Sequence, residues 1–123
     1  MTGDEIRLTL PAEAEYARLA RAAAAALALR LGFAYPEIED LRIAMDETLI
    51  LLLRPEGRAG NITFTFVCGD GELEITARTT AGDDQHYFDA GARSRFDHLV
   101  TGLVDEATVD PGDCSVRIVA RQG

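Results

Sequence analysis

Two hydrophobic periods alternate along the chain, and each change of period marks the boundary of an expected element. Apolar residues at every second position predict a half-buried strand over residues 4–10, which Pro11 ends. The same alternation on both sides of a Gly-Asp-Gly turn at 69–71 predicts a β-hairpin over residues 61–79. Residues 107–121 repeat the pattern around a Pro-Gly-Asp turn and predict a second hairpin.

Three segments have the composition and the longer period that are typical of helices. Residues 12–31 are rich in alanine, leucine and arginine, and Gly32 is the expected residue beyond the C-terminal end. A second helix is expected over residues 37–54, because a proline follows directly and disfavours a further helical residue. A third is expected over 96–106, after a long polar loop over 80–95. The face of the second helix that should cover a sheet consists of Ile38, Leu41, Met45, Thr48 and Leu52.

The expected order is strand, two helices, two strands, helix, two strands. This order predicts an α+β fold, a two-layer α/β sandwich with a mixed, mostly antiparallel sheet and the helices on one face. The length of 123 residues suits one domain, so residues 1–123 are expected to form a single unit.

Composition and charge narrow the class of function. The chain is 47% apolar and 27% charged, which is typical of a soluble globular domain. No apolar run approaches a bilayer-spanning length, and the first residues lack the features of a secretion signal, so we expect a cytoplasmic protein without membrane contact. A net charge of −9 repels phosphate backbones, which argues against direct nucleic-acid binding and favours a basic protein partner.

Few residues suggest metal or nucleophilic chemistry. Cys68 and Cys114 are isolated in strand-like segments and are expected to be free thiols that pack as small hydrophobes. His86 could form a metal site with Asp83 and Asp84, although exposed loop residues are the favoured alternative. The sequence contains no Ser-His-Asp set and no close group of zinc ligands.

The second helix carries two adjacent carboxylates in the middle of its sequence. Asp46 and Glu47 stand directly before Thr48 and the unbroken apolar run 49–53. A pair of carboxylates on a helix usually lies on a solvated face, and that is the simple alternative for this pair.

Four segments carry a resemblance to a known family: 16–20 (YARLA), 38–47 (IEDLRIAMDE), 73–78 (LEITAR) and 102–121. With the order of elements, they resemble the small bacterial anti-sigma factors with serine-protein kinase ancestry. The resemblance covers nearly the whole chain and implies the fold of the histidine-kinase and gyrase ATPases. In that family a glutamate of the second helix is the general base or positions the attacked group, and an asparagine four residues later helps to hold Mg²⁺.

The resemblance assigns the catalytic glutamate to Glu47 and the asparagine to Leu51. A spacing of four residues puts both positions on one face of the helix. Mg²⁺ requires oxygen ligands, and leucine supplies none. The resemblance therefore implies that Glu47 is vestigial and that the metal is not held.

The family positions that contact the nucleotide also depart from the family pattern. The aspartate that receives the adenine amino group becomes Thr79, and the two glycines that follow become Ala81 and Asp83. The glycine-rich lid is replaced by residues 89–99, in which Gly91 is the only glycine. We therefore expect no cofactor, with ATP and Mg²⁺ relevant only if a kinase activity persists.

The resemblance implies a binding module that sequesters a sigma factor and is released by an anti-anti-sigma antagonist. Arg18 matches an arginine that the family uses to contact both partners, although it could also be an ordinary exposed cation. The family also implies a homodimer. The alternative is an active serine/threonine-protein kinase that phosphorylates the antagonist. A third hypothesis is an apolar pocket lined by Leu51 that takes a small hydrophobic molecule.

Overall fold

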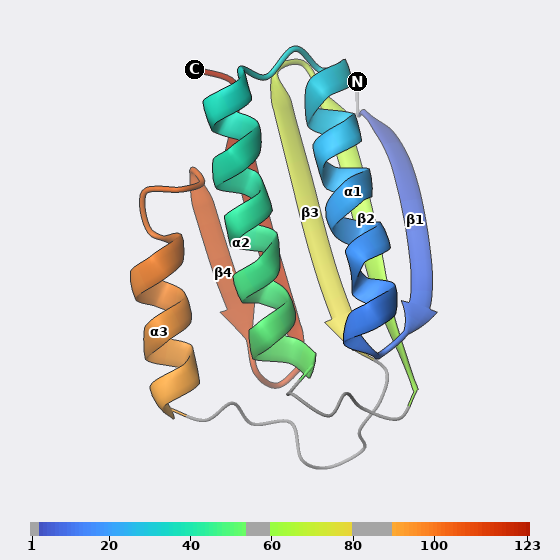
Figure 1. Ribbon diagram of the computed structural model, residues 1–123, viewed down its shortest axis with the longest axis vertical. Coiled ribbons are helices and arrows are strands. Elements are labelled where there is room, and N and C mark those ends of the chain that lie inside the picture. Colours follow the sequence, from blue (N-terminus) through green and yellow to red (C-terminus); the bar gives the residue numbers. More distant parts are fainter. Residues whose placement is uncertain (1–2, 54–59, 80–89) are drawn as a thin grey trace.

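The structure is a computed structural model that describes residues 3–53, 60–79 and 90–123. These residues form five strands and three helices in the order that the hydrophobic pattern predicts (Figure 1). In chain order the elements are β1 (Asp4–Pro11), α1 (Ala14–Arg30), α2 (Tyr35–Leu53), β2 (Asn61–Gly69), β3 (Glu72–Thr79), α3 (Ala90–Val100), β4 (Glu106–Asp110) and β5 (Ser115–Arg121).

The five strands form one sheet in the order β1-β2-β3-β5-β4. All four pairings between these strands are antiparallel. The hairpins β2–β3 and β4–β5 join through β3 and β5, and β1 pairs with β2 at one edge. The three helices lie against one face of the sheet (Figure 1). The predicted α+β fold, a two-layer sandwich with its helices on one face, is confirmed.

The central hairpin of β2 and β3 forms as the alternating pattern predicts. Ile62, Phe64 and Phe66 are all fully buried on the face that the helices cover, and the two phenylalanine rings stack with centroids 6.3 Å apart. Gly71 closes the turn with a φ of 65°, a conformation that residues with a Cβ rarely adopt. The hairpin thus contributes buried side chains of the sheet to the hydrophobic core.

The alanine-rich composition of α1 has a direct packing role. Ala17, Ala20, Ala24 and Ala28 recur every three or four residues and are the buried face of this helix. Small side chains on that face let the helix axis lie close to the sheet. Gly32, with a φ of 91°, is the predicted residue just beyond the C-terminal end of the helix.

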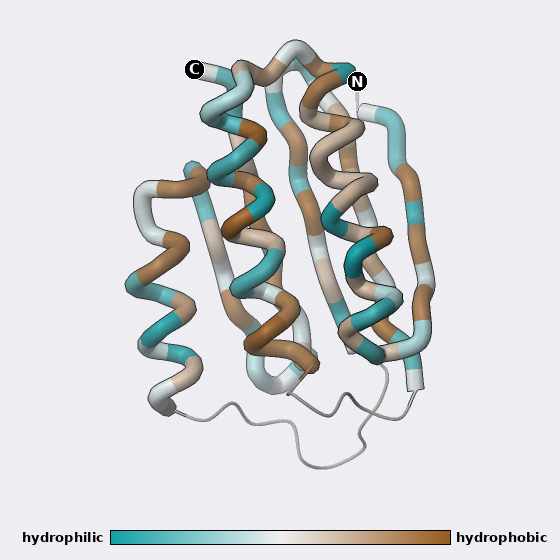
Figure 2. The backbone as a smooth tube through the Cα atoms, in the orientation of Figure 1, coloured by the Kyte–Doolittle hydropathy of each residue, from teal (hydrophilic) through white to brown (hydrophobic). Residues whose placement is uncertain are grey.

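Helix α2 buries the face that the sequence predicts. Ile38, Leu41, Met45, Thr48 and Leu52 all lie in the interior. The last five residues of α2, 49–53, are all apolar (Figure 2). The helix begins at Tyr35, two residues before the predicted start, because Pro36 is tolerated in a first turn. Its predicted last residue, Arg54, lies outside the described residues.

Helix α3 differs from its predicted position. The prediction placed it at 96–106 after a loop over 80–95, whereas the helix spans Ala90–Val100. Phe96 and Val100, one turn apart, are its buried anchors, and Gly102 takes a φ of 91° just beyond its end. Gly102 therefore follows the end of α3, whereas the prediction extended the helix through this residue to 106.

A helix over 96–106 would begin with Asp97 and His98 in its first turn, as N-terminal polar residues, and this prediction is also wrong. Both lie in the second half of α3, and His98 belongs to the last turn, where a basic group suits the helix dipole. Asp97 pairs with Arg93 one turn earlier, at 3.4 Å between Oδ2 and Nε.

The face of the sheet opposite the helices carries a cross-strand network of ion pairs. Arg117 donates to Glu74 at 2.7 Å and to Glu106 at 3.3 Å. Arg121 donates to Glu72 at 3.0 Å and also to Glu106. Glu106 on β4 thus links both arginines of β5, and these bonds lower the pKa of its carboxyl group, Arg121 having the larger effect.

Candidate functional site

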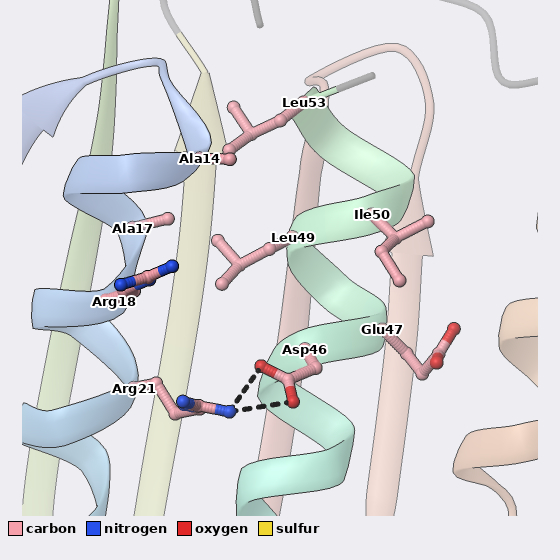
Figure 3. Close-up of a pocket in the computed structure, with 9 residues that line it drawn as sticks. All are labelled: Ala14, Ala17, Arg18, Arg21, Asp46, Glu47, Leu49, Ile50 and Leu53. Atoms are coloured by element: carbon pink, nitrogen blue, oxygen red, sulfur yellow. Dashed lines mark hydrogen bonds and ion pairs between the residues drawn. The ribbon is translucent and has the colours of Figure 1, made fainter. Parts of the chain in front are cut away.

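The two carboxylates in the middle of α2 point in different directions. Asp46 is partly exposed and points toward α1, whereas Glu47 points to the side of α3 (Figure 3). Only 8% of Glu47 is exposed. The simple alternative, in which both acids lie on a solvated face, is therefore wrong for Glu47.

The partner of Glu47 is Arg95 on α3. The Nε of Arg95 donates to Oε1 of Glu47 at 3.1 Å, and its Nη2 donates to Oε2 at 3.3 Å. This forked arrangement uses both carboxylate oxygens, and the hydrogen bond to Glu47 raises the pKa of Arg95. Both oxygens of Glu47 are thereby engaged by a side chain of α3.

Arg95 was not a candidate in the sequence, because its segment was assigned to a loop. The register of α3 brings it to Glu47, which stands 48 residues earlier. No local spacing signals such a contact. The buried pair Phe96 and Val100, four residues apart, was the one available sign that the helix includes Arg95.

Leu51 lies one turn after Glu47 and packs in the hydrophobic core. It is 5% exposed and belongs to the same cluster as Leu52 and Phe64. A hydrocarbon at this position offers no oxygen to a hard cation such as Mg²⁺. The described residues include no group of three or more His, Cys, Asp or Glu that could hold a metal ion.

Thr79 is buried at the end of β3, where its hydroxyl is engaged by a neighbour. Its Oγ1 donates to Sγ of Cys114 at 2.9 Å, and its backbone N–H donates to the Cys114 carbonyl at 3.2 Å. The two cysteines, Cys68 and Cys114, are free and buried, as the sequence predicts. Four loop positions that the sequence singles out lie outside the described residues: Ala81, Asp83, Asp84 and His86.

A cavity of about 530 Å³ opens between α1 and α2. Its apolar lining comes from both helices: Ala14, Ala17, Leu49, Ile50 and Leu53. Leu49 and Leu53 point from α2 toward α1 (Figure 3). Leu51 faces the core instead and is absent from this lining, so the hypothesis of a pocket lined by Leu51 does not describe this cavity.

Four charged residues complete the lining, and three of them are paired. Arg21 donates to both carboxylate oxygens of Asp46, at 3.0 and 3.3 Å, and this bridge spans the two helices (Figure 3). Glu47 is held by Arg95. Arg18 extends from α1 toward α2 and has no ion pair within residues 3–53, 60–79 and 90–123.

Comparisons with known proteins relate the chain to a family. No protein-family model matches it. The serine-protein kinase RsbW of Bacillus cereus (strain B4264) is 37% identical over 76 residues, which are 60% of this chain and 48% of that protein. RsbW of Listeria monocytogenes (serotype 4a, strain HCC23) is 36% identical over 75 residues, 58% of this chain and 48% of that protein.

Similarity to proteins named serine-protein kinase confirms the resemblance that the sequence predicts. The two-layer sandwich agrees with the histidine-kinase and gyrase type of fold expected for that family. The chain spans about half the length of the curated relatives it matches. Among the described helices, none combines the length and the apolar character required to cross a bilayer.

Proposed function

We propose that this chain is an anti-sigma regulatory protein whose nucleotide site is inactive. It sequesters a sigma factor in the cytoplasm by protein–protein binding and releases it when an anti-anti-sigma antagonist competes. Neither ATP nor Mg²⁺ takes part. The relative affinities and amounts of the sigma factor and the antagonist then decide which of them is bound, since both need the same surface of this chain.

The main support for this proposal is that the side chain of Glu47 on α2 is already paired. Both oxygens of this carboxylate are bound by Arg95, and Leu51, one turn later, packs in the core. A kinase of this family needs a free general base and an oxygen ligand for the metal at these two positions. The engaged hydroxyl of Thr79 further weakens any adenine site.

Arg18 is the proposed anchor for both protein partners. It is exposed on α1 beside an apolar cavity, and its guanidinium has no ion pair among the described residues. Arginine at such a site can pair bidentately with a partner's carboxylate while the neighbouring apolar wall excludes water. A homodimer, as the family implies, would present two such surfaces.

An active serine/threonine-protein kinase is the second candidate. It is favoured by the retained Glu47 and by the name of the relatives, serine-protein kinase. In that case Arg95 would have to release Glu47 when nucleotide binds, and residues from 80–95 would have to supply the missing ligands. Phosphorylation of the antagonist, instead of competition alone, would then control the release of the sigma factor.

Affinity capture tests the proposal. The tagged chain is expressed in the cells that produce it, and captured proteins are identified by mass spectrometry with and without added Mg-ATP. We expect a sigma factor to be captured equally in both conditions. Capture of no sigma factor would reject the anti-sigma function, and capture that requires ATP would favour the kinase candidate.

A further inference from the structure

The cavity between α1 and α2 has the composition of a small-molecule site. We propose that it binds an amphipathic monoanion, a medium-chain carboxylate being the simplest example. The methylene chain would lie between the helices, and the carboxylate would pair with Arg18. The cavity borders Glu47, but its apolar walls and Arg18 lie on the side of α2 that faces α1.

The size and the walls of the cavity fit a single hydrocarbon chain. Its volume of about 530 Å³ falls within the range of roughly 300–1,000 Å³ that is usual for ligand sites. Ala14 and Ala17 leave room on the α1 side, and Leu49 and Leu53 supply apolar contacts from α2. Burying methylene groups against these walls is the main source of affinity.

The charged residues that line the cavity favour a ligand with a single negative charge. Arg21 is neutralised by Asp46, and Glu47 is neutralised by Arg95. Arg18 is therefore the one lining charge without an ion pair in the part of the chain that the structure describes. A polyphosphate would face Asp46 and Glu47 with too few cations, and an amine would be repelled by Arg18.

The polar groups of the walls also favour a hydrocarbon over a peptide segment. Both walls are helices, and outside the first turn of α1 and the last turn of α2 their backbone groups bond within each helix. A peptide laid along the middle of the cavity would bring amide groups that find no free backbone partner there, at a cost in affinity. A methylene chain has no amide groups and avoids this cost.

Occupation of the cavity would also occupy Arg18. If the proposed function holds, a bound amphiphile and a bound protein partner exclude each other at this residue. The binding of the amphiphile itself does not depend on that function. Direct titration of the protein alone therefore keeps the two proposals separable.

The test is isothermal titration calorimetry with decanoate as the probe. We expect saturable binding of one decanoate per chain, and no binding of decyltrimethylammonium. Arg18→Gln should weaken decanoate binding about tenfold, as expected for loss of a charge-assisted hydrogen bond. Arg30→Gln is the matched control, because Arg30 is exposed on the same helix and does not line the cavity; it should leave the affinity unchanged.

A second pair of variants tests the apolar wall. Ala14→Leu should fill the cavity and abolish decanoate binding, while Ala22→Leu, on an exposed position of the same helix that does not line the cavity, should have no effect. Thermal unfolding of each variant verifies that it is folded. Absence of saturable decanoate binding to the wild type would overturn the proposal, as would equal losses in the two arginine variants or equal binding by the two leucine variants.

Discussion

Arg95 of α3 donates hydrogen bonds to both carboxylate oxygens of Glu47, the acid that the family relationship assigns to catalysis. Glu47 is nearly buried, whereas the arginine side chain stays 59% exposed. The contact therefore joins the middle of α2 to α3 through this acid. In this chain the same acid connects two helices.

Loss of Arg95 should destabilise the fold more than loss of an ordinary surface arginine. Arg95→Ala leaves the carboxylate of Glu47 buried without its partner, which is costly. We expect a larger decrease in Tm than for Arg42→Ala, which removes an exposed pair with Glu39 on α2. Adding Glu47→Gln to Arg95→Ala should restore part of the loss. Equal decreases in the two single variants would contradict this role of the pair.

Replacement of Leu51 by asparagine should weaken the core without creating a metal site. The buried amide loses the apolar contacts of leucine and finds no partner, so Leu51→Asn should cost about 2–4 kcal/mol in the free energy of unfolding. Ile50→Asn is the control, since Ile50 is 54% exposed; its effect in urea titrations should be much smaller. Tight Mg-ATP binding gained from Leu51→Asn alone would show that the rest of the nucleotide site is intact.

Reversal of the charge on Arg18 should abolish partner capture without unfolding the protein. If Arg18 is a hot spot of the interface, Arg18→Glu should weaken sigma-factor binding by at least about 30-fold, as measured by biolayer interferometry. Arg30→Glu, also exposed on α1, provides the comparison and should bind normally. Unchanged affinity in Arg18→Glu would remove this residue from the interface.

The ion pairs on the open face of the sheet predict a decrease in stability at acid pH. The pKa of Glu106 is lowered below its ordinary value of 4.5 by hydrogen bonds from Arg121 and Arg117. A carboxyl group with a lower pKa in the folded state stabilises it fully above the unfolded value. That contribution is lost as pH falls through the folded value.

Urea unfolding of the wild type and Glu106→Gln measures this dependence. The stability difference between the two should be largest at about pH 6 and should decrease as the pH falls below the ordinary value of 4.5 and through the lower folded-state pKa of Glu106. Glu15→Gln is the control, because Glu15 has no ion pair within the described part of the chain. A stability difference for Glu106→Gln that does not change with pH would rule out this source of acid sensitivity.

Most of the fold follows from local patterns in the sequence. The period of two in 61–79 and the buried face of α2 both appear where they were predicted, because each depends on near neighbours and on one apolar face. Helix α3 was misplaced because polar residues dominate its first turns. Its existence there depends on Phe96 and Val100 reaching the core, which is a tertiary effect.

The candidate site was less predictable than the fold. Family positions could identify Glu47, Leu51 and Thr79, but their partners come from distant elements. Arg95 reaches Glu47 only through the packing of α3 on α2, and Cys114 reaches Thr79 only through the pairing of β5 with β3. Likewise, the cavity beside Arg18 exists because α1 and α2 lie side by side, which no single segment encodes.

Titration of the purified protein with Mg-ATP tests the central claim most directly. The claim is that the Glu47 position now serves structure and that the chain acts by binding proteins alone. Isothermal titration calorimetry should give no heat of binding for Mg-ATP, and incubation with labelled ATP should give no phosphate transfer to a candidate antagonist. Micromolar binding of Mg-ATP accompanied by phosphate transfer would contradict the claim and establish the kinase alternative.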